Sequence, residues 1–179
     1  VPQPEFWLED GFLSNLEWLL PRYGDTYYLV FPLNTIDPEA LDLFGGFEEG
    51  LIALYTKRRL FHNVLAAIVE WKKSRLRAGA ALGAPGAWMT EYMAGADIIS
   101  PATYREFVFP YEQEVVREAH RLGLIVYLWY LGDVMPLVDD IAHLGVDALF
   151  PEQGRKGYDV DIVEIRRRVG ERLCLIGFD

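Results

Sequence analysis

Residues 124–150 read LIVYLWYLGDVMPLVDDIAHLGVDALF and contain two short apolar segments separated by a more polar one. The segments 124–131 and 146–150 are rich in β-branched and aromatic residues, which predicts strands. Between them, 134–144 is expected to be a helix, and Gly145 follows it at a position where helices often end. A strand, a helix and a second strand in this order indicate a parallel sheet with helices outside it.

The same alternation continues outward in both directions along the chain. The strand segments are apolar along their whole length, as expected for parallel strands that are buried on both faces. Ser100 and Pro101 mark a helix start, and Pro110 is expected to restart that helix near Phe109. In chain order the other expected elements are a helix at 12–20 stopped by Pro21, a strand at 26–31, a short helix at 38–44, a long helix around 60–77, a strand within 79–89, a helix ending at Gly123, a helix at 161–169 and a strand at 172–178.

The number of strand–helix units, about five, bears on the fold class. Neither the GxGxxG nor the GxxxxGK[ST] phosphate-binding pattern is present, which disfavours a doubly wound nucleotide-binding fold. We therefore predict an α/β protein of the (β/α)8 TIM-barrel type. A complete barrel has eight strands and about 250 residues, so residues 1–179 are expected to form a single partial barrel domain, cut at both ends. Its open sheet edges favour self-association, and a homodimer is a possible assembly.

The charge of the chain limits its partners. The net charge is −10 and the isoelectric point about 4.8, which argues against nucleic acid and against an anionic membrane surface as partners. No apolar run approaches the ~20 residues of a membrane span, and the start has no signal-peptide pattern. Cys174 is the single cysteine, so no intramolecular disulfide forms. We expect a cytoplasmic protein that binds a small-molecule substrate.

A segment in the middle of the chain resembles a known family. Residues 99–111, ISPATYREFVFPY, are similar to the segment ISP–x–x–[YF]–R–E–F–x–x–P–Y of the uroporphyrinogen decarboxylase superfamily. The resemblance covers 79–179 well and 26–78 more loosely. Further matches, in the expected order, are Gly123, Gly132, Leu144-Gly145-Val146-Asp147-Ala148-Leu149, Pro151-Glu152, Asp159 and Leu175-Ile176-Gly177-Phe178-Asp179.

This resemblance implies a (β/α)8 barrel with its site at the C-terminal ends of the strands. It also implies one of two chemistries. The first is the cofactor-free decarboxylation of the acetate arms of a porphyrinogen, a tetrapyrrole, in porphyrin biosynthesis. The second is methyl transfer to or from corrinoid proteins and thiols, for which zinc is held by an H–x–C pair and a later cysteine. A third reading is a non-catalytic binding barrel that keeps the fold without the chemistry.

Candidate site residues follow from the rule that barrel enzymes carry their function at the C-terminal ends of strands. The expected strand ends collect Asn34, Glu91, Tyr92, Tyr130, Asp133, Glu152, Gln153 and Asp179. Several carboxylates in one cleft would raise one another's pKa and suit proton transfer. The alternative is that these residues are ordinary surface-loop acids, as expected in a chain with a net negative charge. Glu91 is the first catalytic candidate, because by resemblance it matches an acidic residue that faces substrate. It is expected to face the same cavity as Trp129, near Asp133, and the other residues are expected to bind substrate.

Trp129 and Leu131 occupy, by resemblance, the positions of the zinc-binding pair. Neither side chain ligates zinc, so we expect no metal at this site and no cofactor. Strand alternation places Tyr127, Trp129 and Leu131 on one face of the sheet. These side chains are either barrel filling or a stacking wall for a ring-shaped substrate, to which Trp129 would then bind.

Other reactive residues are expected away from this face. Cys174 falls inside a strand and is expected to be a small buried residue. The pair Arg155-Lys156 lies in a loop after a strand, either solvated or facing substrate carboxylates. Three histidines fall in expected helices, the outer elements of a barrel, namely His62, His120 and His143. A solvated helix end is expected for the basic run at the end of the long helix, Lys72, Lys73, Arg75 and Arg77.

Overall fold

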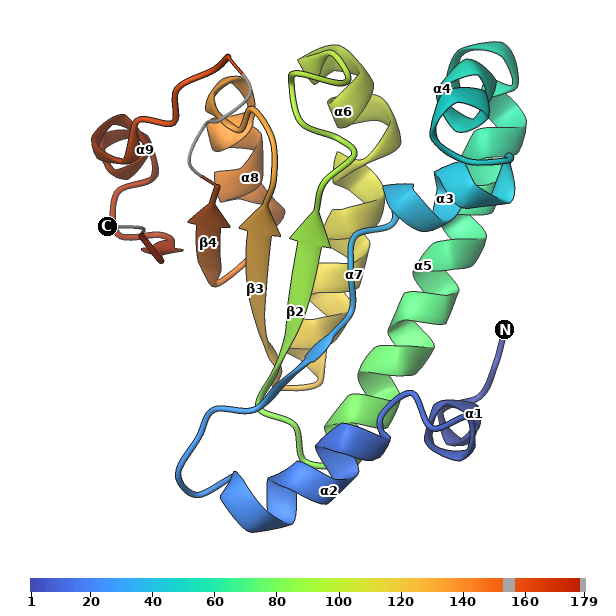
Figure 1. Cartoon of the computed structure of the whole chain (residues 1–179), viewed down its shortest axis with the longest axis vertical. Coiled ribbons are helices and arrows are strands. Elements are labelled where there is room, and N and C mark those ends of the chain that lie inside the picture. Colours follow the sequence, from blue (N-terminus) through green and yellow to red (C-terminus); the bar gives the residue numbers. More distant parts are fainter. Residues whose placement is uncertain (153–156, 178–179) are drawn as a thin grey trace.

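The computed structural model describes residues 1–152 and 157–177. Its strands form one five-stranded sheet in the order β1-β2-β3-β4-β5, with every neighbouring pair parallel. The strands are β1 (Val30–Pro32), β2 (Gly86–Glu91), β3 (Ile125–Tyr130), β4 (Ala148–Pro151) and β5 (Cys174–Leu175). Parallel strands that pair in chain order are the arrangement of a partial (β/α) barrel, so the expected fold class is confirmed (Figure 1).

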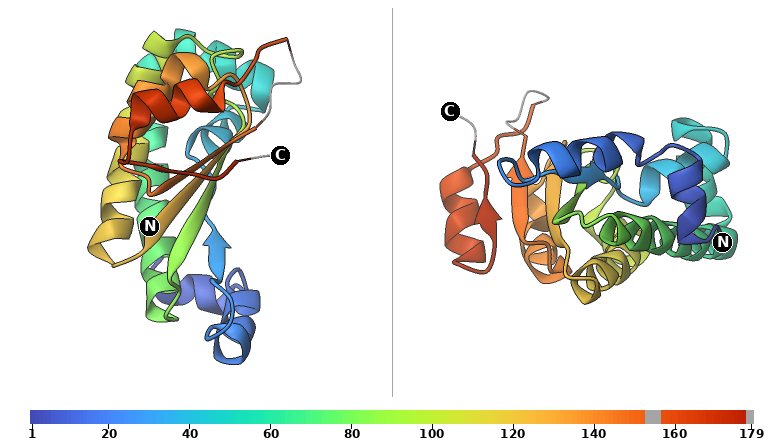
Figure 2. Two further views of the ribbon diagram at one scale, coloured as in Figure 1. Left: turned by 90° about the vertical axis from the view of Figure 1, so that its left-hand side faces the viewer. Right: turned by 90° about the horizontal axis from the view of Figure 1, so that it is seen from below.

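Helices cover one face of this sheet. Figure 1 and the left view of Figure 2 show α5 (Arg58–Ala81), α7 (Phe109–Arg121) and α8 (Val138–Leu144) along that face. On the opposite face, among the described residues, α2 (Ser14–Tyr23) lies only at the end where β1 begins. The remaining helices are α1 (Pro4–Glu9), α3 (Asp37–Leu43), α4 (Phe47–Thr56), α6 (Pro101–Phe107), the short 3₁₀ helix η1 (Met135–Leu137) and α9 (Ile162–Val169).

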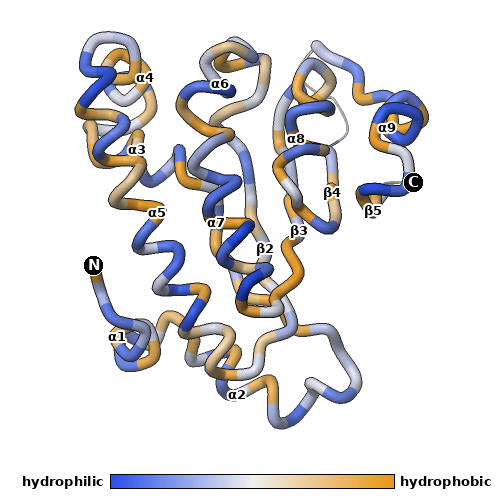
Figure 3. The backbone as a smooth tube through the Cα atoms, turned by 180° about the vertical axis from the view of Figure 1, so that it is seen from behind, coloured by the Kyte–Doolittle hydropathy of each residue, from blue (hydrophilic) through white to orange (hydrophobic). Residues whose placement is uncertain are grey.

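The helix-covered side is held by amphipathic helices. Figure 3 shows hydrophilic and hydrophobic stretches alternating along α5 and α7. Phe61, Leu65 and Ile68 of α5 are buried at helical spacing. Gly79 lets α5 approach β1 closely, because a Cβ there would lie 2.3 Å from the ring of Phe31. In the described part of the chain, none of the helices combines the length and apolar character needed to cross a membrane.

Local signals place the ends of α6 and α7 where the sequence predicts them. Ser100 caps α6, since its hydroxyl oxygen accepts the backbone N–H of Thr103 at 3.1 Å. Pro110 lies in the first turn of α7, where a missing N–H breaks no helical hydrogen bond. Gly123 follows α7 with a φ of +75°, a left-handed conformation that favours glycine.

Two expectations for the N-terminal region are wrong. Pro21 lies inside α2 instead of ending it, and the helix runs to Tyr23. The proline is close to the helix end, so it disturbs little of the hydrogen-bond ladder. The expected strand at 26–31 begins only at Val30, because pairing with β2 starts there, opposite Gly86.

The register of the strands decides which side chains face the helices. On β2, Met89 and Glu91 are fully buried on the helix side, and Trp88 alternates with them on the other face. Tyr127 of β3 lies beside Trp88 in the register and therefore shares its face. We call this second face, which the helices do not cover, the inner face of the sheet.

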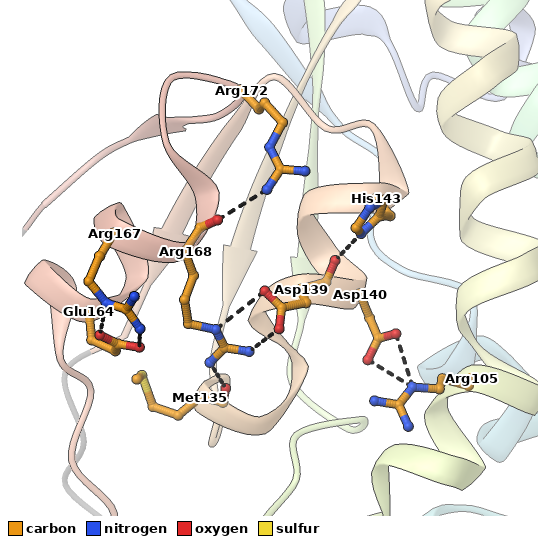
Figure 4. Close-up of polar contacts among 9 residues, drawn as sticks. All are labelled: Arg105, Met135, Asp139, Asp140, His143, Glu164, Arg167, Arg168 and Arg172. Carbon is orange, nitrogen blue, oxygen red and sulfur yellow. Dashed lines mark hydrogen bonds and ion pairs between the residues drawn. The ribbon is translucent and has the colours of Figure 1, made fainter.

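Ion pairs connect helices on the outside of the molecule (Figure 4). Arg168 of α9 donates to a carboxylate oxygen of Asp139 on α8 and to the carbonyl oxygen of Met135, both at 2.7 Å. Arg105 of α6 donates to Asp140 of α8 at 3.0 Å. Because each pair has one partner that is well exposed to water, its contribution to the stability of the fold is small.

Candidate functional site

The inner face of the sheet is an aromatic wall. The ring centroids of Trp88 and Trp129 are 5.6 Å apart, and those of Trp129 and Phe150 are 5.9 Å apart. Tyr127 lies beside them, so the expected shared face of Tyr127 and Trp129 is confirmed. An open hollow of about 300 Å³ on this face is lined by Tyr28, Val30, Trp88, Tyr127, Phe150 and Ile176. Such a surface accepts the flat face of a ring-shaped ligand.

Polar residues lie at the C-terminal ends of the strands, which we call the mouth. Asn34 follows β1 with a φ of +56°, and its side chain is exposed, as is that of Tyr92 after β2. Asp133 follows β3 and is half-buried, and Glu152 follows β4 with its N–H bound to the carbonyl oxygen of Tyr130 at 2.8 Å. The structure therefore brings four of the predicted residues to one end of the sheet.

Asp97 also lies at the mouth, although it was not among the site residues predicted from the sequence. Its Oδ1 accepts the backbone N–H of Asp133 at 2.8 Å, which joins the loop after β2 to the loop after β3. The two loops touch at Gly95 and Gly132, where a Cβ on Gly95 would lie 3.1 Å from the Cα of Gly132. A glycine in each loop was the sequence signal for this contact, because two backbones can approach this closely only where side chains are absent.

Two buried donors near the mouth have no hydrogen-bond partner among the described residues. They are the indole N–H of Trp129 and the hydroxyl of Tyr158. The pKa of Tyr158 is raised, first by burial and then by the negative charges of Asp97, Glu152 and Asp133. An acidic mouth with two unpaired donors can bind a ligand that both donates and accepts hydrogen bonds.

Glu91 is at the end of β2 but does not face this wall. It pairs with Tyr130, while Trp129 pairs with Thr90, so Glu91 and Trp129 point to opposite faces of the sheet. The expected orientation toward the cavity of Trp129 is therefore wrong. Glu91 is fully buried, and its Oε1 accepts the backbone N–H groups of Met93 and Ala94, each at 2.8 Å.

Tyr130, a predicted substrate-binding residue, also points into the helix layer. It is fully buried, and its hydroxyl donates to the carbonyl oxygen of Ala94 at 2.9 Å. Alternation along β3 explains the difference from Trp129. Four further residues named in the sequence analysis lie outside the described residues, namely Gln153, Arg155, Lys156 and Asp179.

Glu91 is part of a group that we call the carboxyl cluster, formed with Asp37 of α3 and Glu112 of α7. One carboxylate oxygen from each lies within 4.8 Å of the others, and all three residues are buried. The pKa of Glu91 is raised well above its ordinary value by burial and then by the charges of Asp37 and Glu112. Burial, followed by Asp37, likewise raises the pKa of Glu112.

The burial of Glu112 has a signal in the sequence. Glu112 lies on one helical stripe with Val115, Val116 and Ala119, all buried. An acid at the i, i+3, i+4 spacing of an apolar stripe faces the core and not the solvent. Lys72 is a similar case, because it was expected to be solvated and is fully buried.

Lys72 is buried because it has partners inside the fold. Its Nζ donates to the carbonyl oxygen of Leu33 and to Oε1 of Glu39, both at 2.6 Å. Burial lowers the pKa of Lys72, and the charge of Glu39 opposes this change. Arg75 reaches the same Glu39 oxygen at 3.0 Å.

The histidines and the cysteine are separate from the mouth. His62 hydrogen-bonds with the Tyr111 hydroxyl, His120 with Asp147 and His143 with the carbonyl oxygen of Asp139, all on or beside outer helices. Cys174 is exposed, so its expected burial is wrong. It pairs with Ala148 and lies on the inner face, which helices do not cover.

Comparison with known proteins gives a consistent match. A family model described as Uroporphyrinogen decarboxylase (URO-D) matches residues 43–178. Uroporphyrinogen decarboxylases from Chlorobaculum parvum, Aromatoleum aromaticum and Shewanella amazonensis are 26%, 29% and 31% identical to this chain over 125, 134 and 135 residues. The matches cover 69%, 69% and 73% of this chain and 34%, 33% and 36% of those proteins. The chain thus spans about a third of the length of these curated relatives.

Among solved structures, a methyltransferase from Methanosarcina mazei is similar, with a TM-score of 0.79. The match covers 92% of this chain and 46% of the methyltransferase, at 20% sequence identity. At that identity the likeness concerns the fold, and it agrees with the partial barrel seen here.

Proposed function

This chain belongs to the uroporphyrinogen decarboxylase family, and from this premise we propose that it removes carboxylate groups from the acetate side chains of a porphyrinogen. The observation that supports this proposal is the aromatic inner face lying beneath an acidic mouth. Pyrrole rings stack on aromatic side chains, and their N–H groups donate to carboxylates. Asp133 and Glu152 are the proposed acceptors, with Trp129 as the stacking partner.

The proposed reaction needs a proton and a place for positive charge. A proton adds to a pyrrole carbon, and the bond between the acetate methylene and its carboxylate then breaks. Carbon dioxide leaves, and the electron pair neutralises the ring and forms an exocyclic methylene. A second proton adds to this methylene to give a methyl group, and the proton on the ring carbon is then lost, so that one net proton replaces the carboxylate. Carboxylates at the mouth stabilise the protonated, cationic pyrrole ring more than the neutral ring of the substrate, which is the requirement for catalysis.

Within this proposal Asn34 and Tyr92, both exposed at the mouth, contact the rim of the substrate. For Glu91 we propose a positioning role, because its side chain holds the loop after β2 and faces the helix layer. The proposed reaction needs no metal ion. This agrees with Trp129 and Leu131, which lie where the resemblance places the zinc-binding pair and have no zinc-binding atoms.

A direct assay tests this function. The purified protein is incubated anaerobically with uroporphyrinogen, and the products are oxidised and separated by carboxylate number. We expect products with progressively fewer carboxylates, ending at four. A Trp129→Leu variant should convert substrate more slowly, and an exposed outer tryptophan, Trp71, provides the matched control as Trp71→Leu. Unchanged substrate after many hours with folded protein would contradict the proposal.

Methyl transfer is the second candidate, suggested by the methyltransferase from Methanosarcina mazei. The same preparation is given methylcobalamin and a thiol, with and without added zinc. Demethylation of the corrinoid would favour this candidate over decarboxylation. Saturable porphyrinogen binding without turnover of either substrate would instead favour a non-catalytic binding barrel.

A further inference from the structure

Most oxygens of the carboxyl cluster have no hydrogen-bond donor. Both oxygens of Asp37, Oε2 of Glu91 and Oε1 of Glu112 are buried without a partner among the described residues. Leaving an ionised carboxylate unpaired in the interior is very unfavourable, so such a group takes up a proton, pairs with a cation or coordinates a metal ion. The carboxyl cluster therefore needs a proton or a cation that the side chains of the described residues do not supply.

The local charge is also unbalanced. Asp37, Glu39, Glu91 and Glu112 carry four negative charges when ionised, against the positive charges of Lys72 and Arg75. Those two cations both bind Glu39, at 2.6 and 3.0 Å. Two negative charges of the carboxyl cluster are left over, which is the charge that one divalent cation balances.

Hydrogen bonds from the backbone oppose the rise in the pKa of Glu91 that burial causes. Its Oε1 accepts two N–H groups, from Met93 and Ala94, each at 2.8 Å. Hydrogen bonds to a carboxylate from N–H donors stabilise its charged state. They also fix the direction of Oε2, the atom left without a donor.

The donor set and its spacing select the kind of ion. All three possible ligand groups are carboxylates, and the Tyr104 hydroxyl donates to Oε2 of Glu112 at 3.5 Å, so that Oε1 is the oxygen of Glu112 left without a partner. Oxygen donors favour Mg²⁺, Mn²⁺ and Ca²⁺ over ions that prefer sulfur or imidazole. Two ligands on opposite sides of such an ion are about 4–5 Å apart, and the cluster oxygens lie within 4.8 Å of one another.

We propose that Asp37, Glu91 and Glu112 form a binding site for one divalent, oxygen-preferring cation. The ion joins the start of α3, the end of β2 and the first turn of α7 beneath the mouth. Its role is to fix the helix layer under the loop after β2, and it stands apart from the decarboxylation proposed above.

Manganese provides the test, because bound Mn²⁺ gives an electron paramagnetic resonance signal distinct from the free ion. The purified protein is unfolded in chelator and refolded with Mn²⁺, since a buried site exchanges slowly once folded. After removal of free ion we expect about one Mn²⁺ per chain and a higher melting temperature than without cation. Glu112→Gln should retain at least tenfold less Mn²⁺, on the scale of losing a metal-site partner.

Glu114→Gln is the matched control, because Glu114 is two residues away on the same helix and forms an exposed ion pair with Lys73. It should bind Mn²⁺ like the parent protein. If Glu112→Gln does not fold, Asp37→Asn is measured in its place. Absence of retained Mn²⁺ in the parent, or equal retention in the cluster variants, overturns the proposal. In that case the three groups share protons, and Glu112→Gln should melt at a higher temperature than the parent at pH 7.

Discussion

Glu91 and Tyr130 are partners in the β2–β3 register, and both side chains hold the same residue of the loop that follows β2. Glu91 accepts the N–H of Ala94 at 2.8 Å, and Tyr130 donates to the carbonyl oxygen of Ala94 at 2.9 Å. Both polar backbone groups of Ala94 are thus bound by buried side chains. The loop is fixed from the helix side, while its other end joins Asp133 at the mouth through Asp97.

Removing the Tyr130 hydroxyl should loosen this loop. In Tyr130→Phe the carbonyl oxygen of Ala94 loses its donor in a buried place, which costs about 1–3 kcal/mol. We expect a lower free energy of unfolding in urea and faster hydrogen exchange at Ala94. The control is Tyr127→Phe, whose hydroxyl lies on the half-buried inner face. Equal stability of the two variants would show that the bond to Ala94 contributes nothing.

The charge of Glu91 can be separated from its hydrogen bonds. In Glu91→Gln the amide oxygen still accepts the N–H groups of Met93 and Ala94, so the loop keeps its support. Because the side chain faces the helix layer, we expect uroporphyrinogen turnover per folded molecule to stay within about threefold of the parent. A direct catalytic group would instead lose about 10²-fold or more. Turnover and unfolding measured on the same preparation distinguish the two roles.

The local signals along the chain predicted the five strands and most of the helices in the right order, whereas α1 and α4 were not predicted. Continuous apolar strands, the Ser100-Pro101 start and the glycines after helices depend on neighbouring residues alone, and they agree with the structure. The start of β1 was misplaced because it depends on where pairing with β2 begins, which is a contact between distant segments.

The candidate site was predicted in position but not in orientation. Strand ends locate Asn34 and Asp133 at the mouth, yet the face to which Glu91 points depends on its register with β3. A shift of one residue changes the face of every side chain on a strand. Lys72 shows a related limit, because its partner Glu39 is 33 residues away in the chain. No spacing rule for a single helix contains that contact.

Trp129 should contribute to substrate affinity more than to stability. It is half-buried and stacks against Trp88 and Phe150 on the inner face. In Trp129→Leu we expect KM for uroporphyrinogen to rise about three- to tenfold, the scale of one aromatic pair. Trp71→Leu, on the outer side of α5, should leave KM unchanged. A fall in kcat with constant KM would mean that Trp129 acts on the reaction step and not on binding.

The stability of the helix layer should depend on pH through Glu118. Its side chain is paired with Arg121 and Arg77, and mainly the hydrogen bonds from Arg121 lower its pKa to about 2. The folded pKa lies below the unfolded value, so the stabilisation is present above pH ~4.5 and is lost as the pH falls toward 2.

Glu118→Gln should therefore be less stable than the parent by about 1–2 kcal/mol at pH 7, after allowance for the exposure of both arginines. The difference should shrink as the pH approaches 2. Glu114→Gln, which removes an exposed ion pair, should change stability by less than about 0.5 kcal/mol. A Glu118→Gln effect that stays constant between pH 7 and pH 3 would contradict the assigned cause.

The inner face should make the isolated chain self-associate. In the described structure it presents Trp88, Tyr127 and Ile176 without a covering helix, and β5 forms an open sheet edge with unpaired backbone groups. Cys174 lies on that face and is exposed, so the rate of its reaction with a thiol reagent shows whether the inner face is covered by a second chain.

We expect sedimentation to show dimers or larger species, and Cys174 labelling to slow as protein concentration rises. Tyr127→Lys, which places a charge on the inner face, should shift the chain toward monomer and restore fast labelling, whereas Trp71→Lys on the outer side should not. A stable monomer that unfolds cooperatively and labels at one rate at all concentrations would show that the uncovered face is tolerated in water.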